Sequence, residues 1–361
     1  MRIVHNVHQV HNVHNVFFFS LFLLLSMMSA PAQSEIPFPD ALDDAAIRLD
    51  KIDDILNNAL IIGNGDINAL LYSDGSNIIL NLTKNDVWDA RLITENDPPI
   101  PTLNLIKTLG ASETAFPMKN NNSSYVLPEG QTWDKKDSYH SNAYPCPRQC
   151  ARVSLHFFGG TVTRGELDLH RAVATVWHSD ASVPPASIRA LADRNVFLIE
   201  SRTALSLKSV ESKDIPKADN GMLDDVSWIL QKIPGDPDWP GMAFAVAAAS
   251  SPKSDWQSIA IVTSLESPDP VKAAVALVKE TLQEKPEDLI QKHEAEWDRF
   301  WSRSGLVLDD PLLQQTWYRS LYFMRCVSKP GVQSTGLFAG LVNDTPAWHG
   351  DYHTNYNIQQ T

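Results

Sequence analysis

The sequence predicts a multidomain β + α chain in which an antiparallel β-sandwich comes first and helices follow. Three observations support this fold class. The chain has 361 residues, more than one ordinary domain requires. Between about residues 60 and 200, short β-prone runs alternate with Gly, Pro, Asn and Asp. Beyond Pro270, apolar residues recur at the three- and four-residue spacing of a helix. With 43% hydrophobic and 20% charged residues, the chain is expected to be globular.

The N-terminus has the features of a secretory signal peptide. The apolar run from Phe17 to Met28 is short for a membrane span, and Ala30 and Ala32 have the small side chains that a signal peptidase recognises. We therefore assign residues 1–32 to a signal peptide and expect a secreted or periplasmic protein. Because no cysteine follows at a lipid-anchoring position, we expect no membrane anchor after cleavage.

Ahead of the apolar run, a repeat built on His-Asn-Val contains four regularly spaced histidines, His5, His8, His11 and His14. Metal binding is one interpretation. The position ahead of a removable signal favours the other, in which the repeat has no role in the mature protein. We predict no metal and no cofactor. The net charge of −13 and the scattered Lys and Arg residues argue against a nucleic-acid partner.

We assign residues 33–270 to the sandwich because this part contains several short strands. Asp74 and Gly75 tolerate positive φ, so they predict a tight turn between two antiparallel strands. The segment from Glu166 to Trp177 alternates apolar and polar residues, as a sheet with one buried face requires. The clearest predicted strands are Ile67–Tyr72, Asn77–Leu82, Arg152–Phe158 and Val196–Ser201.

A polar stretch from Gly110 to Gln149 interrupts the strands. Three asparagines of this half lie in glycosylation sequons, which in a bacterial protein would mark exposed polar turns: Asn81, Asn121 and Asn122. Cys146 and Cys150 either form a small disulfide loop in an oxidising compartment or remain free. Cys326 lies in an apolar helical stretch and is expected to be a buried thiol.

Residues 271–305 predict a helical linker. The run Pro286-Glu287-Asp288 suits the first turn of a helix, where Pro needs no donor and acids favour the positive end of the dipole. Trp297, Phe300 and Trp301 share one face, which we interpret as core packing rather than a sugar platform. A second helix is expected from Pro311 to Val327, with an apolar face that contains Leu312, Leu313, Trp317, Leu321 and Met324.

The last segment is dense in side chains that both donate and accept hydrogen bonds. Asn355 and Asn357 cannot transfer a proton, but their amide oxygens can hold a water molecule while acids elsewhere move protons. Trp348 and Tyr356 offer apolar faces to a sugar ring. The alternative is that Asp351 and both asparagines cap a helix or satisfy loop backbone, and the spacing alone favours it.

The run from Trp348 to Gln359, with Asp-Tyr-His-Thr-Asn-x-Asn-x-Gln at its centre, resembles glycoside hydrolase family 95, the α-L-fucosidase and α-galactosidase family. In that family the corresponding segment lines the sugar pocket. Three further segments are similar to the opening of the family's sandwich: 63–66, 79–81 and 86–88. Residues 84–89 are closer to an uncharacterised relative with the same sandwich. Residues 297–302 and 318–322 are similar to the linker and first barrel helix.

The resemblance implies an N-terminal antiparallel β super-sandwich, a helical linker and, over residues 306–361, the incomplete first part of an (α/α)6 catalytic barrel. Asn355 and Asn357 would position the attacking water. His353, Asp351 and Trp348 would bind the substrate, an oligo- or polysaccharide. The mechanism would be that of an inverting α-glycosidase, which needs two carboxyl groups about 6.5 to 9.5 Å apart.

In the family, those two carboxylates come after the residues that match this chain. We therefore expect a truncated, inactive fragment, in which Trp317, Leu321 and Met324 form an apolar face without a partner. The alternative function is a non-catalytic carbohydrate-binding sandwich. A phosphorolytic barrel relative, in which phosphate replaces the base and the water, is a third interpretation, and the two asparagines argue against it.

Overall fold

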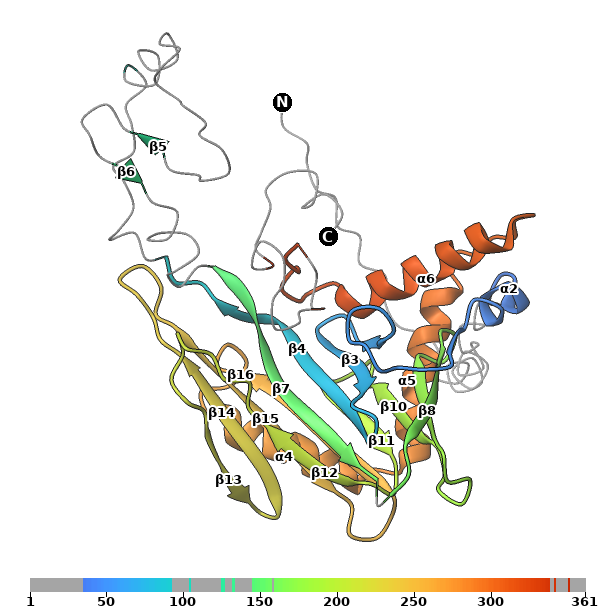
Figure 1. Cartoon of the computed structure of the whole chain (residues 1–361), viewed down its shortest axis with the longest axis horizontal. Helices are drawn as coiled ribbons and strands as arrows, with labels where there is room; N and C mark the ends of the chain where they lie inside the picture. Colours follow the sequence, from blue (N-terminus) through green and yellow to red (C-terminus); the bar gives the residue numbers. More distant parts are fainter. Residues whose placement is uncertain are drawn as a thin grey trace, which may run out of the picture.

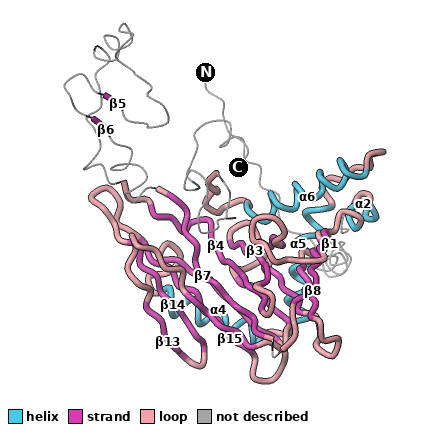
Figure 2. Tube along the Cα trace, in the orientation of Figure 1, coloured by secondary structure: helices cyan, strands magenta, loops and turns pink. Residues whose placement is uncertain are grey.

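The computed structural model describes residues 35–92, 104, 125–126, 132–133, 145–157, 159–337, 341 and 350. Most of them form two antiparallel β-sheets with helices packed around them (Figures 1 and 2). The predicted signal peptide and the sequons at Asn121 and Asn122 lie outside the described residues. No helix in the described ranges is long and apolar enough to cross a membrane.

The larger sheet has nine strands, each antiparallel to its neighbours. In spatial order these are β1 (Ile47–Leu49), β8 (Val162–Asp168), β9 (Val173–His178), β10 (Ala186–Ala190), β11 (Val196–Glu200), β16 (Trp256–Thr263), β15 (Met242–Ser250), β14 (Val226–Ile233) and β13 (Asp219–Leu223). The predicted alternating segment 166–177 therefore spans parts of two strands, β8 and β9, and the turn between them.

The smaller sheet has five strands, in the order β12 (Ala204–Lys208), β7 (Cys146–His156), β4 (Asn77–Asp89), β3 (Ile67–Ser73) and β2 (Leu60–Gly63). The predicted hairpin between β3 and β4 is confirmed, and Gly75 at its turn has φ +103°. The sequon residue Asn81 is buried within β4, so it does not mark an exposed turn. A separate pair is formed by β5 (Tyr125–Val126) and β6 (Thr132–Trp133).

The two sheets enclose one apolar core, which confirms the sandwich. Its members alternate along the strands, as with Leu80 and Leu82 of β4 or Phe197 and Ile199 of β11, all of them essentially inaccessible to solvent. Burying one such side chain fully stabilises the fold by roughly 1.5–3 kcal/mol. Strand periodicity is therefore what defines the two faces of each sheet.

Four helices pack on the sandwich within the described residues: α2 (Pro39–Asp43), α4 (Pro270–Gln283), α5 (Pro286–Trp301) and α6 (Pro311–Val327). The predicted start at Pro286 and the predicted range of α6 are confirmed. The Asp310 side chain accepts hydrogen bonds from the amides of Leu312 and Leu313, which caps α6. Helix α4 covers the outer face of β14, β15 and β16 through Ala274, Val275 and Val278 (Figure 1).

Aromatic side chains join α5 and α6 to the sandwich. Trp297 and Trp301 are buried, as the core interpretation predicts, and the Trp301 indole donates to the Leu169 carbonyl at 3.1 Å. The Trp297 ring stacks on Tyr322 of α6 at 5.1 Å. Phe300 is half-buried at the edge of this cluster and reaches a pocket described below. The two helices are therefore held to the sandwich by a shared core.

The buried face of α6 is not the one that the apolar pattern predicted. Tyr318, Tyr322 and Cys326 face the sandwich, and the Tyr322 hydroxyl donates to the Ile61 carbonyl at 3.1 Å. Tyr is favoured there because it combines a large apolar ring with a group that satisfies buried backbone. The predicted stripe lies partly in solvent, since Met324 is 42% exposed.

Helices α4, α5 and α6 form no closed ring in the part of the chain that is described, so the (α/α)6 barrel and the domain boundaries 33–270, 271–305 and 306–361 stay predictions. The described cysteines are all free and buried. Cys146 and Cys150 lie on the same strand, β7, where residues four apart are separated by about 13 Å, too far for a disulfide. Cys326 is a buried thiol, as expected.

Candidate functional site

The five predicted site residues, Trp348, Asp351, His353, Asn355 and Asn357, lie outside the described residues. Gly350, which lies within the same segment of the sequence, is described and is buried.

Gly336, in the segment after α6, lies close to both Gly350 and Trp88 of β4. A Cβ atom added to Gly336 would lie 2.5 Å from the Gly350 carbonyl oxygen and 2.8 Å from the Trp88 ring. Only a glycine at 336 allows this approach, because any side chain would collide with both groups. The chain that enters the predicted sugar-binding segment therefore passes beside the end of β4.

Asn85 links the segment after α6 to the sandwich through hydrogen bonds. Its buried side-chain amide lies within hydrogen-bonding distance of three carbonyl oxygens: Gly65 at 3.0 Å, Val327 at 2.9 Å and Gln333 at 3.3 Å. The adjacent Trp88 indole donates to the Asn85 carbonyl at 2.8 Å. A shift in the register between β4 and β7 lets this part of β4 bulge away from β7. The bulge turns polar side chains of β4 toward the helices and the second sheet.

Lys84, next to Asn85, is the centre of a buried charge network. Its ammonium group lies 3.0 Å from Asp66, 2.8 Å from Asp86 and 3.2 Å from Glu266. Burial by itself would lower the pKa of Lys84, but the three carboxylates together raise it above its usual value. Because Asn195 donates to both Asp66 and Glu266, the network links the β4 region to the larger sheet.

Asp89, at the end of β4, is fully buried between two arginines. Arg91 and Arg148 each place a guanidinium nitrogen 2.8 Å from its carboxylate. Burial opposes ionisation, but these two hydrogen-bonded cations hold the pKa of Asp89 below its usual value. Asp86 and Asp89, the carboxylates closest to Trp88 in sequence, are thus both engaged in ion pairs. Neither therefore offers the free carboxyl that a general acid needs.

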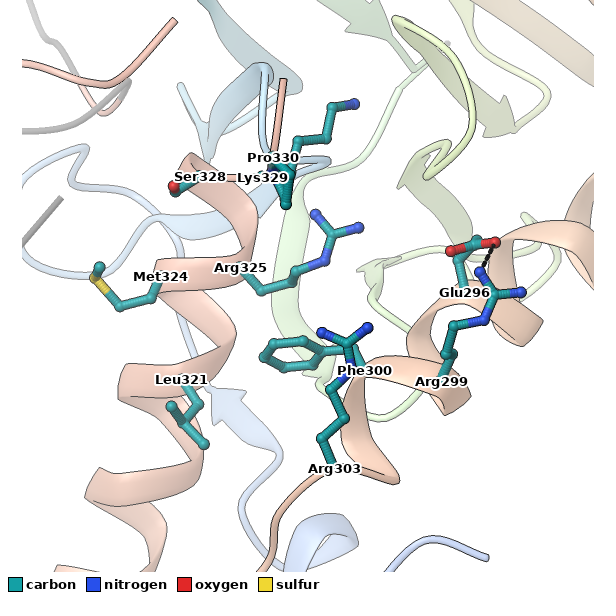
Figure 3. Close-up of a pocket in the computed structure, with 10 residues that line it drawn as sticks. All are labelled: Glu296, Arg299, Phe300, Arg303, Leu321, Met324, Arg325, Ser328, Lys329 and Pro330. Atoms are coloured by element: carbon teal, nitrogen blue, oxygen red, sulfur yellow. Dashed lines mark hydrogen bonds and ion pairs between the residues drawn. The ribbon is translucent and has the colours of Figure 1, made fainter. Parts of the chain in front are cut away.

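A pocket lies between α5 and α6 (Figure 3). This pocket has a volume of about 400 Å³. Apolar atoms dominate its wall, but four of its residues are cationic. The lining consists of Glu296, Arg299, Phe300, Arg303, Leu321, Met324, Arg325, Ser328, Lys329 and Pro330. We call it the α5/α6 pocket.

Sequence reasoning did not find Lys84, Asn85 or the cations of the α5/α6 pocket. The run Lys84-Asn85-Asp86 within an otherwise apolar strand was a usable signal, since a lysine in a buried strand requires a charged partner. The partners themselves are distant in sequence. In the described part of the chain, no cluster of three or more His, Cys, Asp or Glu side chains is arranged to hold a metal.

No protein-family model matches the chain, and no curated protein matches it. Among solved structures, its fold is similar to one described as "Putative kojibiose phosphorylase from human microbiome", at 10% sequence identity and a TM-score of 0.44. The aligned region covers 79% of this chain and 39% of that one, so the chain spans well under half the length of that structure. At this identity no residue role is carried over.

Proposed function

We propose that this is a secreted carbohydrate-active protein of the inverting α-glycosidase type, related to glycoside hydrolase family 95. The single observation that carries the proposal is the segment from Trp348 to Gln359, whose order of Asp, His and two Asn residues resembles the sugar-binding segment of that family. The β-sandwich agrees with the N-terminal half that the resemblance implies.

The geometry at Gly350 adds independent support. An indole ring, Trp88, lies where the chain enters the proposed sugar-binding segment, and its Nε1 is already bonded to backbone. Aromatic rings beside polar groups are suited to sugars, whose C–H faces pack on the ring while their hydroxyls bind amides and carboxylates. The proposed site therefore combines residues 348–357 with the Trp88 end of β4.

In the proposed mechanism, His353, Asp351 and Trp348 bind and orient the sugar. The amide oxygens of Asn355 and Asn357 accept hydrogen bonds from the water that attacks the anomeric carbon. One carboxylate removes a proton from that water and a second protonates the leaving oxygen. Asp86 and Asp89 are already paired with cations, so we assign both proton transfers to carboxylates outside the described residues, on the barrel side.

The second candidate function is carbohydrate binding without turnover, and the ion pairing of Asp86 and Asp89 favours it for this chain taken alone. Binding is common to both candidates, so it is the property to measure first. Hydrolysis then separates them. If a longer form of the protein hydrolyses glycosides, Asn355→Ala and Asn357→Ala should lower kcat more than they raise KM, because they position water and not sugar.

We expect the full chain to bind methyl α-L-fucopyranoside or methyl α-D-galactopyranoside, as measured by isothermal titration calorimetry. His353→Ala should weaken binding about tenfold, which corresponds to about 1.4 kcal/mol for a lost hydrogen bond to substrate. His170→Ala is the matched control, since His170 bonds Asp43 and Asp298 at a distant turn. Equal affinities for the wild type and His353→Ala, or no binding of either glycoside, would overturn the proposed site.

A further inference from the structure

The described residues that line the α5/α6 pocket carry more positive than negative charge. Arg299 forms an ion pair with Glu296 at 2.7 Å, and Glu296 is the one acidic residue among the ten residues that line the pocket. Arg303, Arg325 and Lys329 form no ion pair with any described carboxylate. The chain as a whole carries a net charge of −13, so a concave site with three unpaired cations is not a by-product of a generally basic surface.

The central cation of the pocket is held in place by the fold. The Arg325 guanidinium donates to the Asn64 carbonyl at 3.0 Å and lies 5.5 Å from the centre of the Trp297 ring. Lys329 is anchored next to it, because its Cβ and Cγ atoms pack against Gly65. The Arg325 guanidinium is therefore positioned before any ligand arrives, which lowers the entropic cost of binding.

Burial is the main cause that lowers the pKa of Arg325 and of Lys329 from their usual values. Repulsion from Arg303 adds to this effect for Arg325, and repulsion from Arg325 and Lys84 adds to it for Lys329. Carboxylates oppose the shift: Glu296 for Arg325, and Asp66 and Asp193 for Lys329. An anion in the pocket would relieve this repulsion, and the partly buried position would strengthen the attraction.

The remaining wall is apolar and suits an organic group. Phe300 of α5 and Leu321 and the exposed Met324 of α6 line it, and Figure 3 shows Phe300 between the two helices. A volume of about 400 Å³ lies in the range of small-molecule sites and is larger than an inorganic ion requires.

We propose that the α5/α6 pocket binds a small organic oxyanion, in which a carboxylate, sulfate or phosphate group contacts Arg303, Arg325 and Lys329 and a ring-sized body packs on Phe300 and Leu321. The proposal does not depend on the proposed glycosidase function. An acidic sugar and a free inorganic anion each carry an oxyanion group. The experiment therefore compares the binding of the two.

The test titrates the full chain with sodium glucuronate, sodium sulfate and glucose by calorimetry. We expect glucuronate to bind and glucose not to bind at this site. The double variant Arg303→Gln/Lys329→Gln should weaken glucuronate binding at least about tenfold. The matched control is Arg202→Gln/Lys279→Gln, which removes the same charge from exposed ion pairs elsewhere and should leave the affinity unchanged. Far-ultraviolet circular dichroism checks that each variant folds.

Each outcome decides the proposal. Binding of sulfate alone, lost in the pocket variant, would contradict an organic ligand and show that the site takes only a free inorganic anion. Binding of both anions with glucuronate tighter would support the organic ligand. Absence of binding by either anion, or equal binding by the pocket variant and the control, would overturn it. Loss of glucuronate binding in His353→Ala with none in the pocket variant would also overturn it and place the ligand in the proposed sugar site.

Discussion

Replacing Lys84 by Met is expected to lower the free energy of unfolding by about 3–5 kcal/mol. The lysine side chain is only 2% exposed, and its ammonium group lies within 3.2 Å of Asp66, Asp86 and Glu266. Methionine fills a similar volume but leaves three carboxylates without a cation, two of them largely buried. Urea denaturation at neutral pH measures the change.

Two further variants isolate this effect. Lys279→Met removes a lysine from an exposed pair with Asp224 and should cost less than about 1 kcal/mol. Adding Asp66→Asn and Asp86→Asn to Lys84→Met should recover part of the lost stability, because the neutral amides no longer repel one another. A Lys84→Met protein as stable as the Lys279→Met protein would show that the network does not link the two sheets.

Acidification from pH 6.5 to 4 is expected to destabilise the protein by about 3 kcal/mol through His293 alone. His293 is fully buried, and its Nε2 donates to the Arg171 carbonyl at 2.9 Å. Burial, with Arg189 nearby, lowers its pKa from 6.5 to about 4. Between these two values the unfolded chain holds a proton on His293 that the folded chain does not. Stability is therefore full above pH 6.5 and falls as the pH drops toward 4.

The variant His293→Gln tests this directly, since its amide nitrogen can donate to the same carbonyl but cannot titrate. Carboxylates also contribute to acid denaturation, so the informative quantity is the difference between the two proteins across the pH range. We expect urea denaturation to show a shallower pH dependence for His293→Gln between pH 6.5 and 4. Parallel curves would mean that the buried imidazole accepts its proton without cost.

The strands near the N-terminus were predictable because local signals determine them. Asp74 and Gly75 define a turn through φ alone, and the alternation of apolar residues in β3 and β4 follows from the pleat. The start of α5 at Pro286 and the range of α6 were predictable for the same reason, since proline in the first turn and apolar residues at helical spacing are local signals. Such features need no knowledge of the rest of the fold.

Features that depend on distant partners were not predictable. The β4 bulge brings Lys84 to Glu266, a residue of the other sheet's loops, and no local pattern encodes that pairing. Similarly, α6 has one apolar side with Leu321 and another with Tyr322, and only the position of the sandwich decides which is buried. The pocket cations come from α5, α6 and the turns that follow them, so they converge only in the folded chain.

The proposed sugar site was identified from a resemblance, because asparagine spacing alone favours helix capping. The structure contributes the position of Gly350 near Trp88, on which the proposed location rests.

Photo-crosslinking tests that location most directly. An α-L-fucoside or α-D-galactoside with a diazirine on its aglycone would be bound to the full chain and irradiated, and the labelled peptides identified by mass spectrometry. We expect label on the peptides that contain Trp88 and residues 348–357, suppressed by an excess of the free glycoside. Suppressible label confined to other surfaces, such as the outer strands β13 and β14 or the α5/α6 pocket, would contradict a sugar site at the end of β4.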